Sequence, residues 1–192
     1  MVTRAFCQTA DNYLQNGNEK YKQGDFDGAI SNYNKAIELK PNYTDAYFYR
    51  GILKYKKRNF AGAIQDYDQA IKIKPDYAAA YMNRGVAKGR KGDSDGAIAD
   101  FSKAIELNPN DMLAYNNRGN AKSDKGDLAG AIADYTKAIE LKPDYVSPYV
   151  NRGDAKRGKG DLDGAKADYK KALEIEPGYD QAQKRLDELN KK

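Results

Sequence analysis

Apolar and polar positions recur with a period of 34 residues along most of the chain. The recurring text reads "GAISNYNKAIELKP", "GAIQDYDQAIKIKP", "GAIADFSKAIELNP", "GAIADYTKAIELKP" and "GAKADYKKALEIEP", and each copy ends on a proline. Self-similarity at one fixed period is the signature of a repeat architecture. The pattern predicts one domain, residues 10–179, made of five repeats that span 10–43, 44–77, 78–111, 112–145 and 146–179. A lead of residues 1–9 precedes the repeats, and a tail of residues 180–192 follows them.

Each repeat contains two amphipathic helical patterns. In the third repeat, residues 78–91 and 93–108 carry apolar side chains at the i, i+3, i+4, i+7 spacing of a helix that buries one face. A Gly-Asp pair separates the two helices in four of the repeats. Glycine suits the left-handed residue that ends a helix, and aspartate suits the N-cap of the next one. The second repeat has Arg58-Asn59 instead, which predicts a positive φ at Arg58, at a cost of about 1 kcal/mol.

Small and bulky residues at matched positions predict how the helices pack. Each first helix has a tyrosine followed four residues later by a glycine, and each second helix has two alanines seven residues apart. One helix pair cannot cover its own apolar stripe, so the repeats are expected to stack into a solenoid. The tail, "DQAQKRLDELNKK", predicts an amphipathic capping helix with Ala182, Leu186 and Leu189 facing inward.

This pattern resembles the tetratricopeptide repeat family. The length of 34 residues, the order of aromatic, glycine, alanine and proline positions, and the placement of the turn all match in five consecutive copies, over about nine-tenths of the chain. The resemblance implies an all-α fold, a right-handed superhelical solenoid of five helix-turn-helix repeats with a C-terminal capping helix.

Two positions depart from the family pattern. The seventh position, usually leucine, is arginine in four repeats, and the eleventh, usually aromatic, is lysine in all five: Arg50, Arg84, Arg118 and Arg152; Lys20, Lys54, Lys88, Lys122 and Lys156. An aspartate follows each arginine by sixteen residues, whereas the first repeat has Asn16 and Asn32 at these two places. Because arginine and aspartate occur together or not at all, the sequence favours a partly buried ion pair within each of these four repeats, and contact with a ligand is the alternative role.

The resemblance also implies a function. First helices in this family line a concave groove that binds extended or helical segments of other proteins. Carried over by position, the candidate groove residues are Leu14, Asn18, Tyr21, Phe48, Ile52, Tyr55, Met82, Val86, Arg90 and Asn120. These positions vary between repeats while the packing positions do not, and their N-terminal half is apolar and aromatic. We expect a non-catalytic scaffold that binds a peptide or helix of a partner protein, needs no cofactor, and is monomeric or weakly self-associating.

Three asparagines form a second candidate feature. Asn83, Asn117 and Asn151 recur 34 residues apart on successive first helices. Their amides are expected either to bind an extended peptide backbone or to be hydrogen-bonded within the scaffold.

An alternative hypothesis is an anion-binding edge. Many basic residues fall near the ends of the first helices, namely Lys54, Lys56, Lys57, Arg58, Lys88, Arg90, Lys91, Lys122, Lys125, Lys156, Arg157 and Lys159. Cations at helix C-termini also offset the helix dipole. The functional alternative is an acidic protein, a nucleic acid or a membrane surface, although the stacking-aromatic motifs of RNA-binding domains are absent.

Composition argues against an enzyme. The chain has no histidine and a single cysteine, Cys7, which removes the usual general base and any cysteine cluster for a metal. The segment from Gly153 matches part of a phosphate-binding loop, but in register Gly153 is the packing glycine of the repeat and Gly160 is the turn glycine. No apolar run approaches the ~18 residues of a membrane span, and no signal peptide is visible, so we expect a cytoplasmic protein without a small-molecule substrate.

Overall fold

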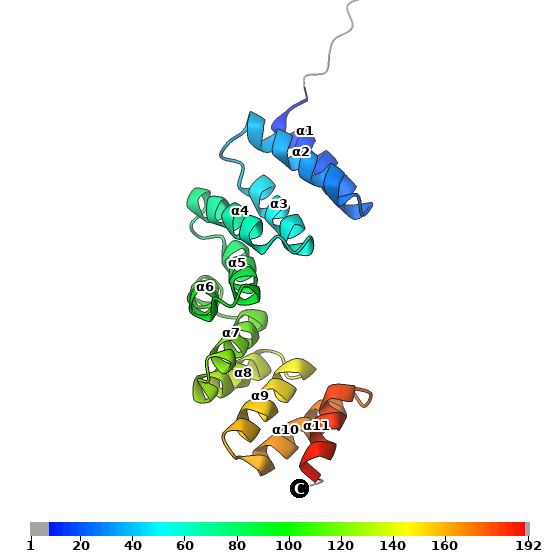
Figure 1. Ribbon diagram of the computed structural model, residues 1–192, viewed down its shortest axis with the longest axis vertical. Helices are drawn as coiled ribbons and strands as arrows, with labels where there is room; N and C mark the ends of the chain where they lie inside the picture. Colours follow the sequence, from blue (N-terminus) through cyan, green and yellow to red (C-terminus); the bar gives the residue numbers. More distant parts are fainter. Residues whose placement is uncertain (1–7, 191–192) are drawn as a thin grey trace, which may run out of the picture. The chain divides into compact units, whose positions relative to one another are not determined.

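The computed structural model describes residues 8–190, which form eleven α-helices and no strand. The chain falls into two compact units, unit 1 up to Lys91 and unit 2 from Gly92 onward. Unit 1 contains α1 (Ala10–Lys22), α2 (Phe26–Leu39), α3 (Thr44–Lys56), α4 (Phe60–Ile73) and α5 (Ala78–Arg90) (Figure 1). Unit 2 contains α6 (Ser94–Leu107), α7 (Met112–Asp124), α8 (Leu128–Leu141), α9 (Val146–Gly158), α10 (Leu162–Ile175) and α11 (Asp180–Asn190).

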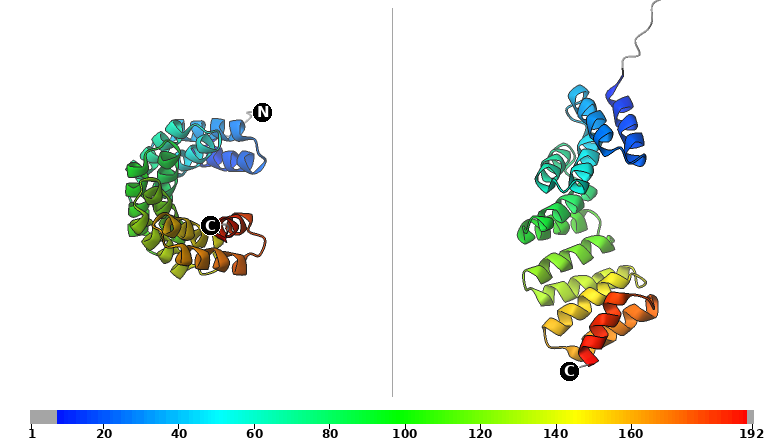
Figure 2. Two further views of the ribbon diagram at one scale, coloured as in Figure 1. Left: turned by 60° about the horizontal axis from the view of Figure 1, so that its bottom comes forward. Right: turned by 45° about the vertical axis from the view of Figure 1, so that its right-hand side comes forward.

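Within each unit, every helix packs against the next one along the chain, as seen for α1 and α2 or α9 and α10 in Figure 2. This arrangement confirms the all-α repeat fold. Most of the predicted lead, residues 1–7, and the last two residues of the tail lie outside the described residues. The division of the chain into one repeat domain with a lead and a tail stays a prediction.

The turns between paired helices have the predicted geometry. Gly24, Gly92, Gly126 and Gly160 have φ between 78° and 85°. An Asp or Asn precedes each second helix as its N-cap, and its Oδ1 accepts a hydrogen bond of 2.9 Å from the backbone N–H three residues later, for example from Gly28 to Asp25. Arg58 has a φ of 61°, which confirms the expected left-handed conformation at this position.

Glycine allows the two helices of a repeat to approach closely. A Cβ built on Gly17, Gly51, Gly119 or Gly153 would lie 2.5 to 2.7 Å from a ring carbon of the tyrosine sixteen residues later. Those tyrosines, Tyr33, Tyr67, Tyr135 and Tyr169, are almost fully buried. The matched glycine and tyrosine therefore fix the spacing of each pair, because even a methyl group would overlap the ring.

Separate apolar clusters form the cores of the two units. In unit 1, Ala29, Tyr33 and Ala36 pack with Leu14 and Leu53, and a second cluster forms around Phe48, Ala63, Tyr67 and Ala70. In unit 2, one cluster gathers Val150, Tyr169 and Ala172 with two side chains of α11, Ala182 and Leu189. The last helix thus covers apolar surface that a further repeat would cover in a longer array.

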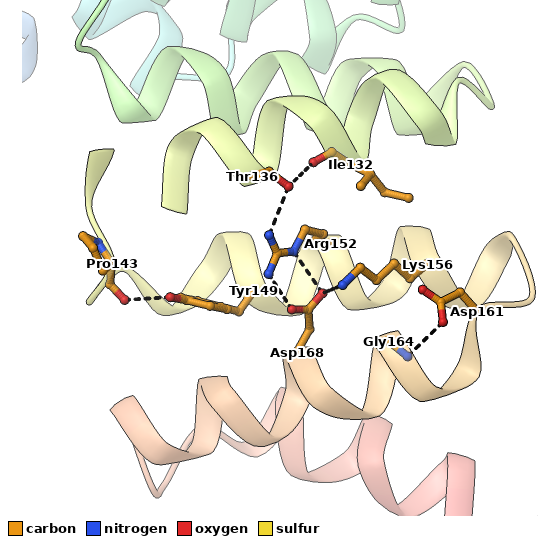
Figure 3. Close-up of polar contacts among 9 residues, drawn as sticks. All are labelled: Ile132, Thr136, Pro143, Tyr149, Arg152, Lys156, Asp161, Gly164 and Asp168. Atoms are coloured by element: carbon orange, nitrogen blue, oxygen red, sulfur yellow. Dashed lines mark hydrogen bonds and ion pairs between the residues drawn. The ribbon is translucent and has the colours of Figure 1, made fainter. Parts of the chain in front are cut away.

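The arginine at the seventh position of the fifth repeat anchors a buried polar contact (Figure 3). Arg152 donates from Nε and Nη2 to the two carboxylate oxygens of Asp168, at 3.0 and 2.7 Å. Its Nη1 donates to Thr136 Oγ1 of the preceding repeat at 3.0 Å, and Lys156 Nζ lies 2.8 Å from Asp168. The guanidinium also lies 5.8 Å from the ring centre of Tyr149. One arginine therefore joins two helices of its own repeat to the repeat before it.

The same contact recurs in both units. Arg50 pairs with Asp66 in unit 1, and Arg118 pairs with Asp134 in unit 2, each in two hydrogen bonds of 2.6 to 2.9 Å. Lysine at the eleventh position completes each triad, with Lys54 and Lys122 at 2.8 Å from the carboxylate. The predicted ion pair is thus confirmed in the second, fourth and fifth repeats. Arg84 and Asp100 of the third repeat belong to different units, so their pairing stays a prediction.

Candidate partner-binding surface

Two of the predicted partner-binding residues in unit 1 lie in its core. Leu14 is 9% exposed and packs with the first apolar cluster. Phe48 is 8% exposed, and its ring centre lies 5.6, 6.0 and 4.8 Å from those of Tyr49, Tyr67 and Tyr77. Both side chains support the fold, so substitutions there would test folding as much as binding.

The other apolar candidates of unit 1 are accessible on the first helices. Tyr21 is 36% exposed, and Ile52, Tyr55, Met82 and Val86 are half-buried. They come from α1, α3 and α5, and α3 packs against α5. The first helices of unit 1 therefore present a row of accessible apolar and aromatic side chains, which we call the unit 1 face.

Two pairs of aromatic rings lie at the edge of this face, where the first helices end. The ring centre of Tyr21 lies 5.9 Å from that of Phe26, and the ring centre of Tyr55 lies 5.3 Å from that of Phe60. Lys56 Nζ lies 5.8 and 6.0 Å from the ring centres of the first pair. Arg90 Nε donates a long hydrogen bond of 3.3 Å to the hydroxyl of Tyr55. Rings and cations thus alternate along this edge of unit 1.

The candidate asparagines are hydrogen-bonded inside the scaffold wherever the structure describes a contact. Asn18 Oδ1 accepts from the Tyr33 hydroxyl at 2.8 Å, and Asn83 Nδ2 donates to the carbonyl of Ala79 in its own helix at 2.8 Å. Neither contact extends a ladder from one first helix to the next.

Three side-chain amides of unit 2, those of Asn116, Asn120 and Asn151, form a hydrogen-bonded network. Asn151 Nδ2 donates to Asn116 Oδ1 and to Asn120 Oδ1, both at 3.1 Å. The Tyr135 hydroxyl donates to the same oxygen of Asn120 at 2.8 Å. Among residues 8–190, no side-chain hydrogen bond joins Asn117 to Asn151. The amides that meet on this face therefore bond to one another.

Asn116, which accepts from Asn151 in this network, is 5% exposed, although its place in the repeat corresponds to a groove position of the family. The sequence contains one signal of this burial, the residue type at the matching positions. The matching residues of the other repeats are Leu14, Phe48, Met82 and Val150, all apolar. A single amide in an otherwise apolar series marks a position where a buried polar partner is needed.

A charged cluster closes the C-terminal end of unit 2. Asp154 Oδ1 accepts from the Tyr169 hydroxyl at 2.8 Å and lies 3.1 Å from Arg185 Nε of α11. Arg157 Nη1 donates to Glu188 at 3.0 Å, and this hydrogen bond, with the nearby Arg185, lowers the pKa of the glutamate. The capping helix therefore engages the polar side chains that end the row of first helices.

The predicted basic edge separates into paired and unpaired cations. Lys54, Lys122 and Lys156 belong to the buried triads. Lys57 and Lys125 contact Asp27 and Asp95 across successive repeats, and Arg157 contacts Glu188. By contrast, Lys56, Arg58 and Arg90 form no ion pair within the described part of the chain. These three cations line one open pocket of about 310 Å³ together with Tyr55 and Phe60.

Charge also differs between the units. Residues 1–91 contain 16 basic and 9 acidic side chains, a net charge of +7, whereas residues 92–192 contain 17 basic and 19 acidic side chains, a net charge of −2. The surplus positive charge of the chain therefore belongs to unit 1.

Neither a membrane span nor a metal centre is found in the described residues. No helix between residues 8 and 190 is both long enough and apolar enough to cross a bilayer. The same residues contain no group of three or more histidine, cysteine, aspartate or glutamate side chains placed to hold a metal ion.

The paired helices, the turn glycines and the packing tyrosines define a helical repeat scaffold. Matches to family models identify the type of repeat. A model described as "TPR repeat" matches residues 17–58, 54–92 and 119–158, and models described as "Tetratricopeptide repeat" match residues 78–111, 101–133 and 146–179. The chain belongs to the tetratricopeptide repeat family.

Several solved structures have the same fold. A crystal structure of MamA protein is 32% identical, with a TM-score of 0.83, and the match covers 88% of this chain and 93% of that one. The MamA fragment from Desulfovibrio magneticus RS-1 is 20% identical, with a TM-score of 0.84 and coverage of 89% and 97%. YrrB, described as a TPR protein with an unusual peptide-binding site, is 22% identical, with a TM-score of 0.81 and coverage of 92% and 91%. No curated protein sequence matches the chain.

Proposed function

We propose that this protein is a non-catalytic scaffold that binds a peptide or helical segment of a partner protein on the unit 1 face. The observation that carries this proposal is the row of accessible side chains, Tyr21, Ile52, Tyr55, Met82 and Val86, at positions that vary between repeats. Accessible apolar side chains gathered on one surface favour an interaction site, because isolated ones are normal but contiguous ones are not.

The contrast with unit 2 supports this assignment. There the first-helix positions hold Asn116, Asn120 and Asn151, whose amides bond to one another. Arg157 is engaged by Glu188 of the capping helix. A peptide that bound these groups would first have to break hydrogen bonds that are already made, and an unpaired buried amide is costly.

A similar fold offers a precedent for the ligand class. The printed description of YrrB assigns it a peptide-binding site, and at 22% identity the likeness supports the shared fold rather than shared residues. The lone cysteine agrees with a reducing cytoplasmic setting. We expect a monomer or weak self-association, with no cofactor and no small-molecule substrate.

Substitutions on the unit 1 face test the proposal. The double variant Ile52→Ser, Met82→Ser removes two half-buried apolar side chains from the unit 1 face. Leu113→Ser is the matched control, because Leu113 is an exposed leucine, 43% accessible, on the first helix of the fourth repeat in unit 2. Proteins captured by the purified chain would be compared by quantitative mass spectrometry.

The double variant should lose the partners that the wild type retains, while Leu113→Ser keeps them. Circular dichroism would establish that both variants keep their helix content. Retention of the same partners by the double variant would contradict the proposal, and so would their loss from the unit 2 control alone.

A further inference from the structure

The turn of the second repeat differs from the other four in charge. Those turns read Gly-Asp, whereas this one reads Arg58-Asn59. Relative to them, one position gains a cation and the next loses an anion. Asn59 still caps α4, accepting from Gly62 N–H at 2.9 Å. The cap is therefore preserved while the turn becomes more positive by two charges.

Arg58 holds a conformation that the other repeats give to glycine. Its φ of 61° is the one positive φ of a non-glycine residue in residues 8–190. Side chains in this region carry strain, and such strain is concentrated at binding and catalytic sites. Nothing in the packing calls for an arginine here, since its side chain is exposed.

Arg58 lies in a pocket with two further cations and two aromatic rings. Lys56 and Tyr55 come from the end of α3, Phe60 from the start of α4 and Arg90 from the end of α5. The pocket measures about 310 Å³, and no acidic side chain lines it. We call it the turn pocket.

Among residues 8–190, no ion pair involves the cations of this pocket, whereas neighbouring lysines do form ion pairs. Lys57, next to Arg58, contacts Asp27, and Lys54 contacts Asp66. Arg90 Nε donates to the neutral hydroxyl of Tyr55. The positive charge of the turn pocket is thus available to a ligand.

The residues that form this pocket are not repeated in unit 2. Those that match Arg58 are Gly92, Gly126 and Gly160, and those that match Arg90 are Asp124 and Gly158. The ring pair is missing as well, because the residues that match Tyr55 are Ser123 and Arg157. The pocket therefore arises from residues particular to the second and third repeats, not from the repeat pattern.

We propose that the turn pocket binds an acidic side chain of the peptide held by the unit 1 face, so this inference rests on the proposed function. The carboxylate lies between the guanidinium groups of Arg58 and Arg90, since each guanidinium matches a carboxylate in two hydrogen bonds. A neighbouring apolar or aromatic side chain of the peptide packs on Tyr55 and Phe60.

Pocket size and charge distribution favour a peptide over a nucleic acid. A volume of about 310 Å³ lies at the small end of ligand pockets and holds one or two side chains. A single nucleic acid strand needs cations that follow successive phosphates along a groove. Here the unpaired cations named above gather at one point, beside rings already paired with each other.

Fluorescence anisotropy with defined probes tests the inference. The main probe is a short fluorescein-labelled peptide of alternating glutamate and tyrosine, and its matched control has glutamine in place of glutamate. Labelled oligothymidylate and phosphatidylserine vesicles represent the other anionic classes. The variants are Arg58→Gly, which restores the residue of the other turns, and Arg90→Gln. Lys159→Gln removes a turn cation from unit 2 and serves as the control.

The glutamate peptide should bind the wild type, and the double variant Arg58→Gly, Arg90→Gln should weaken it by at least about tenfold, as loss of charge-assisted contacts implies. Lys159→Gln should change the affinity by less than about twofold, as is usual for an exposed rim charge. Equal affinity of the wild type and the double variant would overturn the inference. So would equal binding of the glutamine peptide, or tighter binding of oligothymidylate or vesicles through the same arginines.

Partner capture separates this inference from the proposed function. Partners lost by Ile52→Ser, Met82→Ser but retained by Arg58→Gly, Arg90→Gln would overturn the turn pocket alone. Partners retained by both double variants would overturn the proposed function together with the pocket that rests on it. Loss of the partners by both double variants would support the proposed function and the turn pocket.

Discussion

Units 1 and 2 are built from the same repeat but differ in how they use its variable positions. Both contain the buried triad of arginine, lysine and aspartate, and both have glycine against tyrosine between paired helices. In unit 2, polar side chains of the first helices already bond to one another through their amides or form ion pairs with α11. Unit 1 leaves apolar side chains and a basic pocket accessible. The comparison shows that periodic residues make the scaffold, while departures from the period mark the candidate site.

The largest expected effect comes from breaking the buried triad, which both units contain. Arg50→Met in unit 1 and Arg118→Met in unit 2 should each lower the free energy of unfolding by about 3 kcal/mol, because each leaves a buried carboxylate without its guanidinium. Asp66 and Asp134 are 3% and 4% exposed. Urea unfolding followed by circular dichroism would measure the change.

A second substitution provides the control for this prediction. Asp134→Leu added to Arg118→Met should restore much of the loss, since a well-packed apolar pair often replaces a buried ion pair without cost. A loss below about 1 kcal/mol in either single variant, the range of a surface ion pair, would show that the triad is not a common support of the two units.

The two units should also differ in how much an asparagine side chain contributes to stability. Asn151→Leu should lower the free energy of unfolding by about 2 kcal/mol, because the buried oxygen of Asn116 loses its donor. Asn83→Leu should change the free energy of unfolding by less than about 0.5 kcal/mol, because the hydrogen bond of Asn83 is made within its own helix at the surface. Thermal or urea unfolding would compare them, and equal effects would contradict the hydrogen-bonded network assigned to unit 2.

The smallest expected change concerns the turns. Arg58→Gly should raise the free energy of unfolding by about 0.5–1 kcal/mol by removing the left-handed strain, and Gly126→Arg should lower it by about 1 kcal/mol. Gly126 has a φ of 82° in the matching turn of unit 2. A destabilised Arg58→Gly variant would mean that the arginine supports the fold, which would weaken its assignment to binding.

Much of the scaffold could be predicted from the sequence because it repeats. The turn conformation of Arg58 and the pairing of Arg152 with Asp168 both follow from fixed offsets within the 34-residue period. The 34-residue period does not determine which neighbouring residue a long side chain contacts. The contact from Arg152 to Thr136 in the preceding repeat, and the third member of the triad, Lys156, therefore appear only in the structure.

The candidate site was harder to predict for the same reason. Family position places Phe48 on a groove, yet the rings of Tyr49, Tyr67 and Tyr77 pack around its side chain and bury it. The amide of Asn151 reaches Asn116 and Asn120 because a side chain on a helix leans toward the turn before it. Such contacts depend on the distance between neighbouring helices, which the sequence pattern does not give.

The central claim is that unit 1 carries the partner-binding surface while unit 2 is closed by its own contacts. Backbone NMR spectra of the full chain, titrated with the alternating glutamate and tyrosine peptide, test it most directly. We predict chemical shift changes at residues of the unit 1 face and turn pocket, such as Ile52 and Arg58, with little change at Asn151 and Arg157. Changes concentrated at Asn151 and Arg157, with Ile52 and Arg58 unaffected, would contradict the account.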